Sequence, residues 1–309
     1  MKKILITGGA GFIASCLAER LIKNPEHYVV MVDNLLTGSA LKLPDNTYKN
    51  WRFIKGDVNN YETLSSIMLS HAFDYVFHYA AVVGVQRTLA NPVMVLDDIT
   101  GIRNVLELSK NTGVQRTYFS SSSEVYGEPV EFPQNEQTTP LNSRLPYAIV
   151  KNVGESYFKS YQQEFGLDYT IYRFFNTYGP KQSSDFVISK FIRAALAHDD
   201  ITIYGDGSQT RTFCFIDDHL DATVRAFMEN LYVNDVVNIG SDVEIPILEV
   251  AKLVIDLTKS RSKLVHLPAL KEGDMTRRQP DIAKMKQLLS RDPMPLREGI
   301  ERILKSGLF

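Results

Sequence analysis

Short apolar runs alternate with amphipathic stretches through the first half of the sequence. The runs are rich in β-branched and aromatic residues, and they predict strands at residues 3–7, 28–33, 51–56, 75–79, 117–121 and 169–174. Apolar residues at helical spacing predict helices at residues 12–23, 61–70, 91–111 and 147–165. Continuous apolar strands separated by helices are typical of a parallel sheet covered by helices on both faces. The pattern therefore predicts an α/β fold with a doubly wound parallel sheet.

The pattern loosens after Asn176. Stretches rich in Gly, Ser, Asp and Pro predict loops at residues 179–185, 205–209 and 272–281. A further strand is expected at residues 236–240 and a helix at residues 247–259. We therefore expect two domains. Residues 1–175 form the doubly wound part, which the strand near 236–240 rejoins, and residues 176–309 form mainly a smaller, mixed α/β substrate-binding region.

Charge and cysteine content exclude several classes of partner. Lys and Arg number 34 against 36 Asp and Glu, which gives a formal net charge of −2. This balance provides no electrostatic reason to expect a nucleic acid or an anionic membrane as partner. With two cysteines, no CxxC motif and no His cluster, neither a disulfide framework nor a metal site is expected, and a reducing cytoplasm is the expected location. No apolar run is long enough to cross a bilayer.

A glycine-rich turn links the first predicted strand to the first helix, over residues 7–14 (TGGAGFIA). Gly8 permits a tight turn, and Gly11 lets the backbone approach a pyrophosphate at the positive end of the helix. Ala14, at the third glycine position, is small enough for helix–strand packing. Asp33 ends the second strand, where a carboxylate accepts hydrogen bonds from both ribose hydroxyls and repels a 2′-phosphate. The sequence thus predicts a Rossmann domain that binds NAD rather than NADP.

Other residues of the strand ends are expected to complete the cofactor site. Asp57, after the third strand, faces the adenine in this interpretation, although a strand-end turn explains it equally well. The remaining residues expected to contact NAD are Phe12, Ile13, Asn34, Thr37, Gly38, Val58 and Ala80, together with Tyr147 and Lys151.

Tyr147 and Lys151 form a YxxxK pair within a predicted helix, and the spacing of four places both side chains on one face. A nearby ammonium lowers the pKa of a tyrosine, so that its phenolate can act as a base. Upstream, the Ser-rich residues 120–123 end the fifth strand, at the sheet edge where such folds bind ligands. A serine there, Ser122, is expected to hydrogen-bond the hydroxyl that is oxidised.

These motifs resemble those of the extended short-chain dehydrogenase/reductases, and their order and spacing resemble the nucleotide-sugar epimerase/dehydratase family. The resemblance covers almost the whole chain and rests on TGGAGFIA, Asp33, SSSSEVYG (120–127), PYAIVK (146–151), RFFNTYGP (173–180), YGDGSQTRTF (204–213) and RRQPDI (277–282). It implies tightly held and recycled NAD. It also implies oxidation of a sugar hydroxyl, usually at C4, followed by chemistry on the keto sugar and return of the hydride.

Glu124 bears on which reaction follows the oxidation. Simple 4-epimerases usually lack a carboxylate at this position, and dehydratases that remove the 6-hydroxyl typically have an Asp-Glu pair, whereas here Ser123 precedes Glu124. The pattern resembles most closely that of UDP-glucuronate decarboxylases, which form UDP-xylose. In that family an arginine near the C-terminus, matched here by Arg278, holds the substrate carboxylate or assists protonation of C5, and Arg277 is an alternative.

Other features leave different reactions open. The YAIVK form of the Tyr–Lys motif departs from the form frequent in decarboxylases, and residues 82–87, with Arg87, resemble the substrate loop of an epimerase. A 4-epimerase and a dehydratase acting across C5 and C6 therefore remain alternatives. A non-enzymatic NAD-binding scaffold is disfavoured, because such proteins are expected to have lost the catalytic Tyr or Lys.

The resemblance also implies contacts to the nucleotide. Asn176 matches an Asn that contacts the diphosphate, and Arg211 matches a phosphate clamp. The residues expected to line a uridine pocket or contact the sugar are Arg87, Ser123, Val187, Lys190, Phe191, Ile203 and Tyr204. Core packing is the alternative for Val187 and Ile203, and a surface lysine is the alternative for Lys190. The expected partner is a nucleotide-sugar, UDP-linked by resemblance. The family implies a homodimer formed by the helices at residues 91–111 and 147–165.

Overall fold

The computed structural model describes residues 1–128, 130–269 and 277–307, and it divides into two compact units. The first unit comprises residues 1–125, 141–173 and 223–237, and the second comprises residues 126–140, 174–222 and 238–309, apart from the residues outside the described ranges. The predicted loop at residues 272–281 lies partly outside the described residues.

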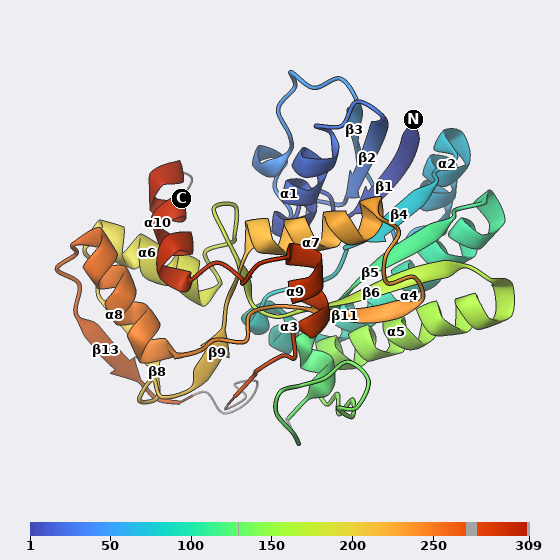
Figure 1. Ribbon diagram of the computed structural model, residues 1–309. Coiled ribbons are helices and arrows are strands. Elements are labelled where there is room, and N and C mark those ends of the chain that lie inside the picture. Colours follow the sequence, from blue (N-terminus) through green and yellow to red (C-terminus); the bar gives the residue numbers. More distant parts are fainter. Residues whose placement is uncertain (129, 270–276, 308–309) are drawn as a thin grey trace. The chain divides into compact units, whose positions relative to one another are not determined.

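A seven-stranded sheet with the order β11-β6-β5-β4-β1-β2-β3 forms the centre of the first unit (Figure 1). Its strands are β1 (Lys2–Thr7), β2 (His27–Asp33), β3 (Trp51–Lys55), β4 (Tyr75–His78), β5 (Arg116–Ser122), β6 (Asp168–Phe174) and β11 (Asp235–Ile239). The pairs from β3 through β2, β1 and β4 to β5 are parallel. The predicted doubly wound sheet is confirmed, and the strand expected at residues 236–240 is its edge strand, β11.

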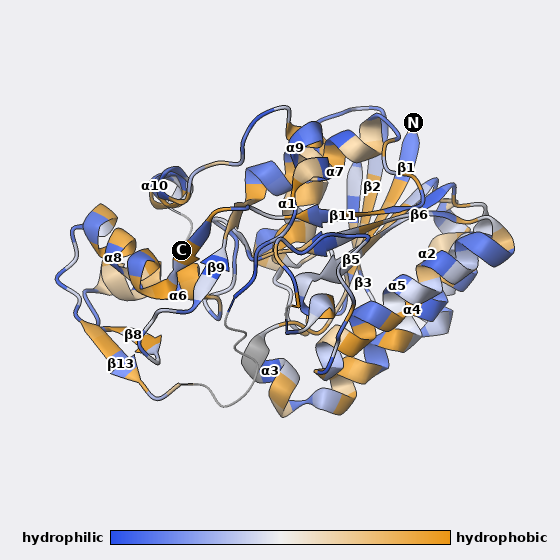
Figure 2. Ribbon diagram, turned by 60° about the horizontal axis from the view of Figure 1, so that its bottom comes forward, coloured by the Kyte–Doolittle hydropathy of each residue, from blue (hydrophilic) through white to orange (hydrophobic). Residues whose placement is uncertain are grey.

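Helices cover both faces of this sheet (Figure 2). The helices that begin in the first unit are α1 (Phe12–Leu21), α2 (Tyr61–His71), α3 (Val85–Ala90), α4 (Pro92–Thr112) and α5 (Pro146–Phe165). Residues of α2, α4 and α5 belong to one core cluster with the sheet, while α1 packs on β1 and β2 from the other side. Buried apolar side chains on each helix thus cover the continuous apolar strands, as the alternation in the sequence predicts.

Close packing between α5 and β5 fixes the helix that carries the Tyr–Lys pair. Pro146 opens α5, where its fixed φ suits the first helical turn, and Gly166 closes it with a φ of 71°. Midway along, a Cβ at Gly154 would lie 2.5 Å from the ring of Phe119 on β5. Phe119 also stacks on Phe158 of α5, with ring centroids 4.7 Å apart. The missing side chain at Gly154 therefore lets α5 approach the strand whose end carries the serines.

The second unit is a mixture of short strand pairs and helices. Its strands pair as β7 (Thr177–Tyr178) with β10 (Cys214–Phe215), β9 (Thr210–Thr212) with β12 (Glu244–Pro246), and β8 (Ile201–Tyr204) with β13 (Leu264–Leu267). Its helices are α6 (Val187–Ala197), α8 (Ile247–Thr258), α9 (Ala283–Leu289) and α10 (Leu296–Ser306), while α7 (Ile216–Met228) runs from this unit into the first. The pattern analysis did not predict α6, although its buried residues Ile188, Phe191, Ile192 and Ala195 recur at helical spacing.

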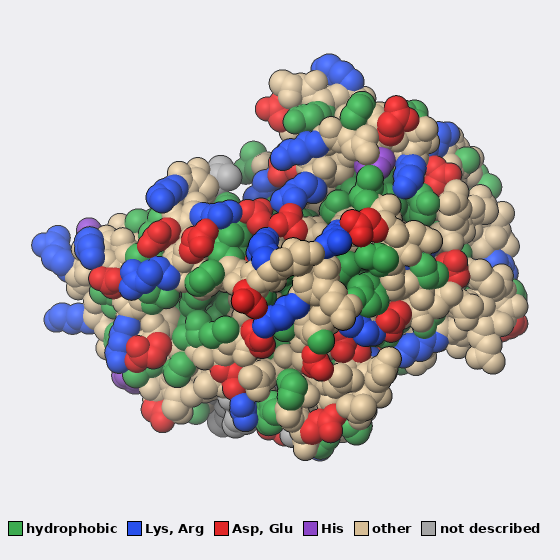
Figure 3. All heavy atoms as spheres, in the orientation of Figure 1, with side chains coloured by type: hydrophobic (Ala, Val, Ile, Leu, Met, Phe, Trp, Pro, Cys, Tyr) green, Lys and Arg blue, Asp and Glu red, His purple; other side chains and the backbone are tan. Residues whose placement is uncertain are grey.

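Basic and acidic side chains are interspersed over the face in view in Figure 3, in keeping with the balanced composition. Within the described ranges, every helix is too short or too polar to cross a membrane.

Candidate active site

The turn after β1 forms a cradle of backbone groups. Gly8 has a φ of 67°, and a Cβ there would lie 2.7 Å from the backbone nitrogen of Ala80, which follows β4. The backbone N–H of Gly11 donates to the carbonyl of Gly8 at 2.9 Å and closes the turn. Gly11 is the N-cap of α1 and has no side chain that could bond the first amides of the helix. These amides are therefore available for an anion such as a pyrophosphate.

Asp33 is held against this turn at the end of β2. One carboxylate oxygen accepts from the Ala10 N–H at 3.0 Å, and the other accepts from the Leu35 N–H at 2.7 Å. A Cβ at Gly38 would lie 2.8 Å from the carboxylate, so only glycine allows the loop to pass this close. The turn and the fixed carboxylate lie together at the strand edge, in the arrangement that the pyrophosphate and adenosine ribose of NAD require.

Asn34 and Asp57 come together at the ends of β2 and β3. The Asn34 side-chain amide donates to an Asp57 carboxylate oxygen at 3.0 Å, and the other oxygen accepts from the Asn59 N–H at 2.8 Å. Val58 is buried next to them, and Phe12, Ile13, Thr37 and Ala80 are half-buried along the same strand ends. The sequence-predicted cofactor residues of the strand ends therefore share one edge of the sheet.

Lys151 is buried beneath the serine-rich end of β5. Its ammonium donates to the backbone carbonyl of Ser120 at 2.6 Å and lies 3.4 Å from the Ser120 hydroxyl. It also lies 5.8 Å from the ring centroid of Tyr147, one helical turn away. Burial lowers the pKa of Lys151 to about 8, and the charge of Asp98 on α4 acts in the opposite direction. The ammonium is thus desolvated beside the tyrosine, as activation of a phenolate requires.

The end of β5 continues directly into a 3₁₀ turn that carries the acidic candidate, over Ser123–Tyr126. Ser122 is buried, and its hydroxyl oxygen accepts from the Glu124 N–H at 3.2 Å. Ser123 is buried and Glu124 is half-buried. The turn therefore places a carboxylate-bearing residue two positions after the serine that is predicted to contact the sugar.

Sequence reasoning missed two acidic residues at this site. Asp98 on α4 accepts the Val82 N–H at 2.7 Å, and burial raises the pKa of its carboxyl. Glu155 on α5 is buried and bonds both Ser121 and Arg173. The spacing of four from Lys151 to Glu155 was a signal for the second, because it places Glu155 on the helix face that carries the Tyr–Lys pair.

Arg87 lies on α3, in the segment that resembles an epimerase loop. Its guanidinium donates to the backbone carbonyl of Val83 at 2.7 Å.

Asn176 and Arg211 lie near each other in the second unit. The Asn176 side-chain amide donates to the Thr212 carbonyl at 3.0 Å, and the backbone carbonyl of Asn176 accepts from the Cys214 N–H at 3.2 Å. Arg211 lies on β9, next to Thr212, with its guanidinium donating to the Thr210 carbonyl at 2.7 Å. The two residues that resemble diphosphate contacts are therefore neighbours within this unit.

The residues that resemble a uridine pocket separate into two kinds. Phe191 and Ile203 are 2% and 1% exposed and belong to the buried core, whereas Val187 is half-buried. Lys190 is exposed, and its ammonium lies 5.6 Å from the ring centroid of Tyr204. Lys190 and Tyr204 are therefore the side chains of this group that a ligand can reach together.

Arg277 and Arg278 differ sharply in their surroundings. Arg277 is exposed, forms two charge-assisted bonds of 2.7 and 2.6 Å with Glu244, and stacks 4.2 Å from the Phe132 ring centroid. Arg278 is 6% exposed. Arg277 therefore has a carboxylate partner within its own unit and lies at the surface, whereas Arg278 is buried.

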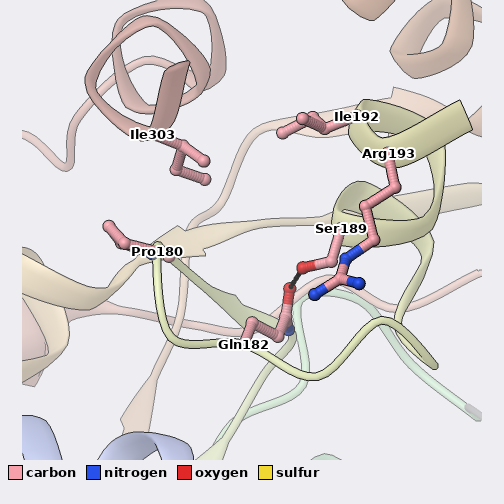
Figure 4. A pocket seen from close by; sticks show the side chains of 7 residues that line it. Pro180, Gln182, Ser189, Ile192, Arg193 and Ile303 are labelled. Atoms are coloured by element: carbon pink, nitrogen blue, oxygen red, sulfur yellow. Dashed lines mark hydrogen bonds between the residues drawn. The ribbon is translucent and has the colours of Figure 1, made fainter. Parts of the chain in front are cut away.

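A small hollow lies in the second unit, partly on the helix α6 that also carries Val187, Lys190 and Phe191. It is lined by Gly179, Pro180, Gln182, Ser189, Ile192, Arg193 and Ile303. Figure 4 shows Ser189 and Gln182 pointing toward each other, with the serine hydroxyl donating at 3.1 Å. None of the sequence-predicted site residues lines this hollow.

Comparison with known proteins identifies the family. A model of the NAD dependent epimerase/dehydratase family matches residues 4–240. The chain belongs to this family. Its members are NAD-dependent, and the glycine turn and Asp33 supply the binding features that NAD requires. The chain is thus an NAD-dependent enzyme.

Relatives within the epimerase/dehydratase family have different activities. UDP-N-acetyl-alpha-D-glucosaminuronate decarboxylase of Bacillus cytotoxicus is 37% identical over 306 residues, which cover 94% of this chain and 93% of that protein. UDP-glucuronic acid decarboxylase 1 of Danio rerio is 35% identical over 98% of this chain and 72% of that protein. The solved UDP-glucose 4-epimerase of Thermotoga maritima with UDP-glucose matches with a TM-score of 0.92 at 32% identity, covering 98% of this chain and 97% of that one.

Proposed function

We propose that this family member is a UDP-glucuronate decarboxylase that forms UDP-xylose. The observation that carries the proposal is Glu124, whose backbone N–H bonds the hydroxyl of Ser122 at the end of β5. Ser123 stands where the dehydratases that remove a 6-hydroxyl typically have an aspartic acid. The chain thus lacks, at this position, the acid that protonates a leaving hydroxyl, but it retains a carboxylate near the reacting sugar.

The oxidising step depends on three side chains of the first unit. Bound NAD would supply the hydride acceptor for oxidation at C4 of the sugar and the hydride donor for the later reduction. We assign Tyr147 as the base that takes the proton of the 4-hydroxyl, and Ser122 as the residue that orients this hydroxyl. The Lys151 ammonium, 5.8 Å from the Tyr147 ring centroid, stabilises the phenolate form of the tyrosine.

Oxidation at C4 makes the substrate a β-keto acid, which loses carbon dioxide readily. The C5–C6 bond breaks, and its electron pair is delocalised onto the C4 oxygen as an enolate. C5 is then protonated, and the regenerated ketone is reduced, so that the reaction is redox-neutral overall. We assign Glu124 to protonation at C5, and Arg278 to holding the substrate carboxylate before it leaves.

The nucleotide is assigned to residues of the second unit. Arg211 and Asn176 are proposed to bind the diphosphate, because a guanidinium matches phosphate oxygens in geometry and charge. Lys190 and Tyr204, which lie together, are proposed as further contacts to the nucleotide. A UDP-linked sugar and a homodimer are part of the proposal, the first because all three relatives described above are named for UDP-sugars.

A 4-epimerase is the second candidate, favoured by the match to a solved 4-epimerase over nearly the whole chain and by the loop that carries Arg87. In that reaction the keto sugar rotates within the site and receives the hydride on its opposite face. No carbon–carbon bond is broken and no enolate forms at C5, so Glu124 would have no carbon to protonate.

Product mass distinguishes these fates. We would incubate the purified protein with NAD and, in parallel, UDP-glucuronate, UDP-N-acetylglucosaminuronate and UDP-glucose. A product lighter by one carbon dioxide is expected from UDP-glucuronate. A product of unchanged mass and new stereochemistry would establish an epimerase, and one lighter by water would establish a dehydratase. Loss of carbon dioxide from the N-acetylated sugar alone would correct the substrate and retain the decarboxylase chemistry.

The role of Glu124 has its own test. Glu124→Gln removes the proton donor but retains the size and the backbone of the residue. We expect this variant to oxidise UDP-glucuronate and then stall, so that the absorbance of bound NADH accumulates. Glu128→Gln, four residues later and exposed, is the matched control and should turn over normally. Absence of NADH accumulation together with normal product formation in Glu124→Gln would contradict the assigned role.

A further inference from the structure

A buried carboxylate links the three elements that build the catalytic end of the first unit. Glu155 on α5 is 1% exposed. It accepts a hydrogen bond of 2.6 Å from the Ser121 hydroxyl on β5. It also accepts two bonds, of 2.8 and 2.7 Å, from the Arg173 guanidinium on β6, which is 2% exposed. One side chain therefore ties a helix to two neighbouring strands.

Glu155 continues a line of functional residues along α5. Tyr147, Lys151 and Glu155 follow one another at intervals of four, so they lie on one face of the helix. Lys151 bonds the backbone of Ser120, and Glu155 bonds the side chain of the next residue, Ser121. Two successive turns of the helix thus hold two successive residues of the strand.

This double attachment determines where Ser122 lies. Ser122 directly follows Ser121 and ends β5, and its hydroxyl accepts from the Glu124 N–H at 3.2 Å. With the Ser121 side chain fixed on Glu155, the backbone of Ser122 at the end of the strand is held in place as well. A shift or rotation of the strand end would move Ser122 relative to Tyr147, and a displacement of about 1 Å between catalytic groups can lower a rate about a hundredfold.

We propose that Glu155 is a positioning residue of the reaction, which acts through Ser121 to hold the end of β5 in register with Tyr147 and Lys151. Arg173 orients the Glu155 carboxylate, since a bidentate pair fixes its plane. The inference rests on the assignment of Tyr147, Lys151 and Ser122 in the proposed function. It is independent of whether decarboxylation or epimerisation follows the oxidation.

Ser121→Ala is the most direct test, because it removes one hydroxyl and leaves the Glu155–Arg173 pair intact. Replacing Glu155 or Arg173 would leave the other buried charge without its ion-pair partner and risk unfolding the protein. Ser109→Ala on α4 is the matched control: Ser109 is also fully buried, and its hydroxyl has no hydrogen-bond partner among the described residues. Ser121→Thr restores a hydroxyl at the tested position.

We expect Ser121→Ala to lower kcat by roughly tenfold to a hundredfold with KM changed by less than about threefold. The acidic limb of its pH–rate profile should move to higher pH, because a loosened Lys151 stabilises the Tyr147 phenolate less. Ser121→Thr should recover most of the rate, and Ser109→Ala should match the wild type. A Ser121→Ala variant that loses stability but keeps the wild-type kcat and pH profile would overturn the proposal, because Glu155 would then serve stability alone.

A substrate-free measurement separates this inference from the proposed function. Ultraviolet titration of the NAD-bound protein follows tyrosinate formation, and loss of the transition in Tyr147→Phe identifies the signal of Tyr147. We expect this transition at higher pH in Ser121→Ala than in the wild type, even if none of the three tested sugars is a substrate. An unchanged transition would overturn the positioning role, whereas wild-type inactivity on every sugar would count only against the proposed function.

Discussion

Burial of Lys151 should make the active site a source of instability. Desolvation lowers the pKa of this lysine from 10.5 to about 8. One pKa unit corresponds to about 1.4 kcal/mol, so keeping the ammonium charged in the folded protein at neutral pH costs about 3 kcal/mol. Lys151→Met removes this cost but also removes the bond from the charged ammonium to the Ser120 carbonyl, which is worth about 2 kcal/mol. We therefore expect the variant to be about 1 kcal/mol more stable than the wild type at pH 7, while it loses turnover.

The gain should depend on pH in a defined window. Between about pH 8 and 10.5 the unfolded chain holds a proton on Lys151 that the folded chain has released. Stability of the wild type therefore rises with pH through this window, since the state that binds more protons is the unfolded one. The cost is present in full below about pH 8 and absent above 10.5. The difference between variant and wild type should thus shrink as pH rises through the window.

Chemical denaturation at pH 7 and at pH 9.5 measures both effects. Lys23→Met, at an exposed lysine beyond α1, controls for the change of side chain and should shift stability by less than about 0.5 kcal/mol at either pH. A Lys151→Met variant that is less stable than the wild type at pH 7, by more than about 1 kcal/mol, would refute the reasoning. It would show that the contacts of the ammonium outweigh its desolvation.

Three further predictions concern the cofactor site and the catalytic base. Gly8→Ala should abolish NAD binding in calorimetry, because its Cβ meets backbone atoms at 2.7 Å, whereas Gly166→Ala, with a similar φ of 71° and open space around it, should bind normally. Asp33→Asn should weaken NAD binding roughly tenfold or more and narrow the preference for NAD over NADP. The reason is that an amide cannot accept from both of the backbone N–H groups that bond the carboxylate. Tyr147→Phe should reduce turnover by roughly 10²–10⁴-fold with NAD binding retained. Equal rates in Tyr147→Phe and in Tyr157→Phe, a control on the same helix, would exclude the assigned base.

The regular elements of the first unit could be predicted because their signal is local. Predicted strands such as residues 28–33 and 169–174 differ from β2 and β6 by a residue at their starts. The apolar runs are continuous, and Pro146 and Gly166 mark the ends of α5 within a residue of the prediction. Burial on both faces of a parallel strand leaves a pattern that needs no knowledge of distant residues.

The second unit was harder to predict, because longer-range contacts determine its structure. Helix α6 has buried residues at helical spacing, yet the pattern analysis did not predict it. Phe191 of α6 and Ile203 of β8 both belong to the core. Arg277 is distinguished from Arg278 by its ion pair with Glu244, which lies 33 residues before Arg277 in the chain. Nothing in the RRQPDI motif itself distinguishes the two arginines.

The same distinction between local and distant signals runs through the candidate active site. The spacing of four that joins Tyr147 to Lys151 is visible in the sequence, and it extends one step further to Glu155. What the sequence does not reveal is that Glu155 meets Arg173, 18 residues away, and Ser121, 34 residues away. Two residues one turn apart on this helix therefore have opposite effects on the stability of the fold. Lys151 is a charge whose burial lacks a bidentate partner and destabilises the fold, whereas Glu155 is a charge whose burial is compensated by three bonds. A catalytic ammonium has to keep its charge available to the tyrosine, so a neutralising ion pair of the Glu155 kind at Lys151 would stabilise the protein and weaken the base. The paired charge therefore lies one turn further on, where it can hold the strand without neutralising the ammonium beside the tyrosine.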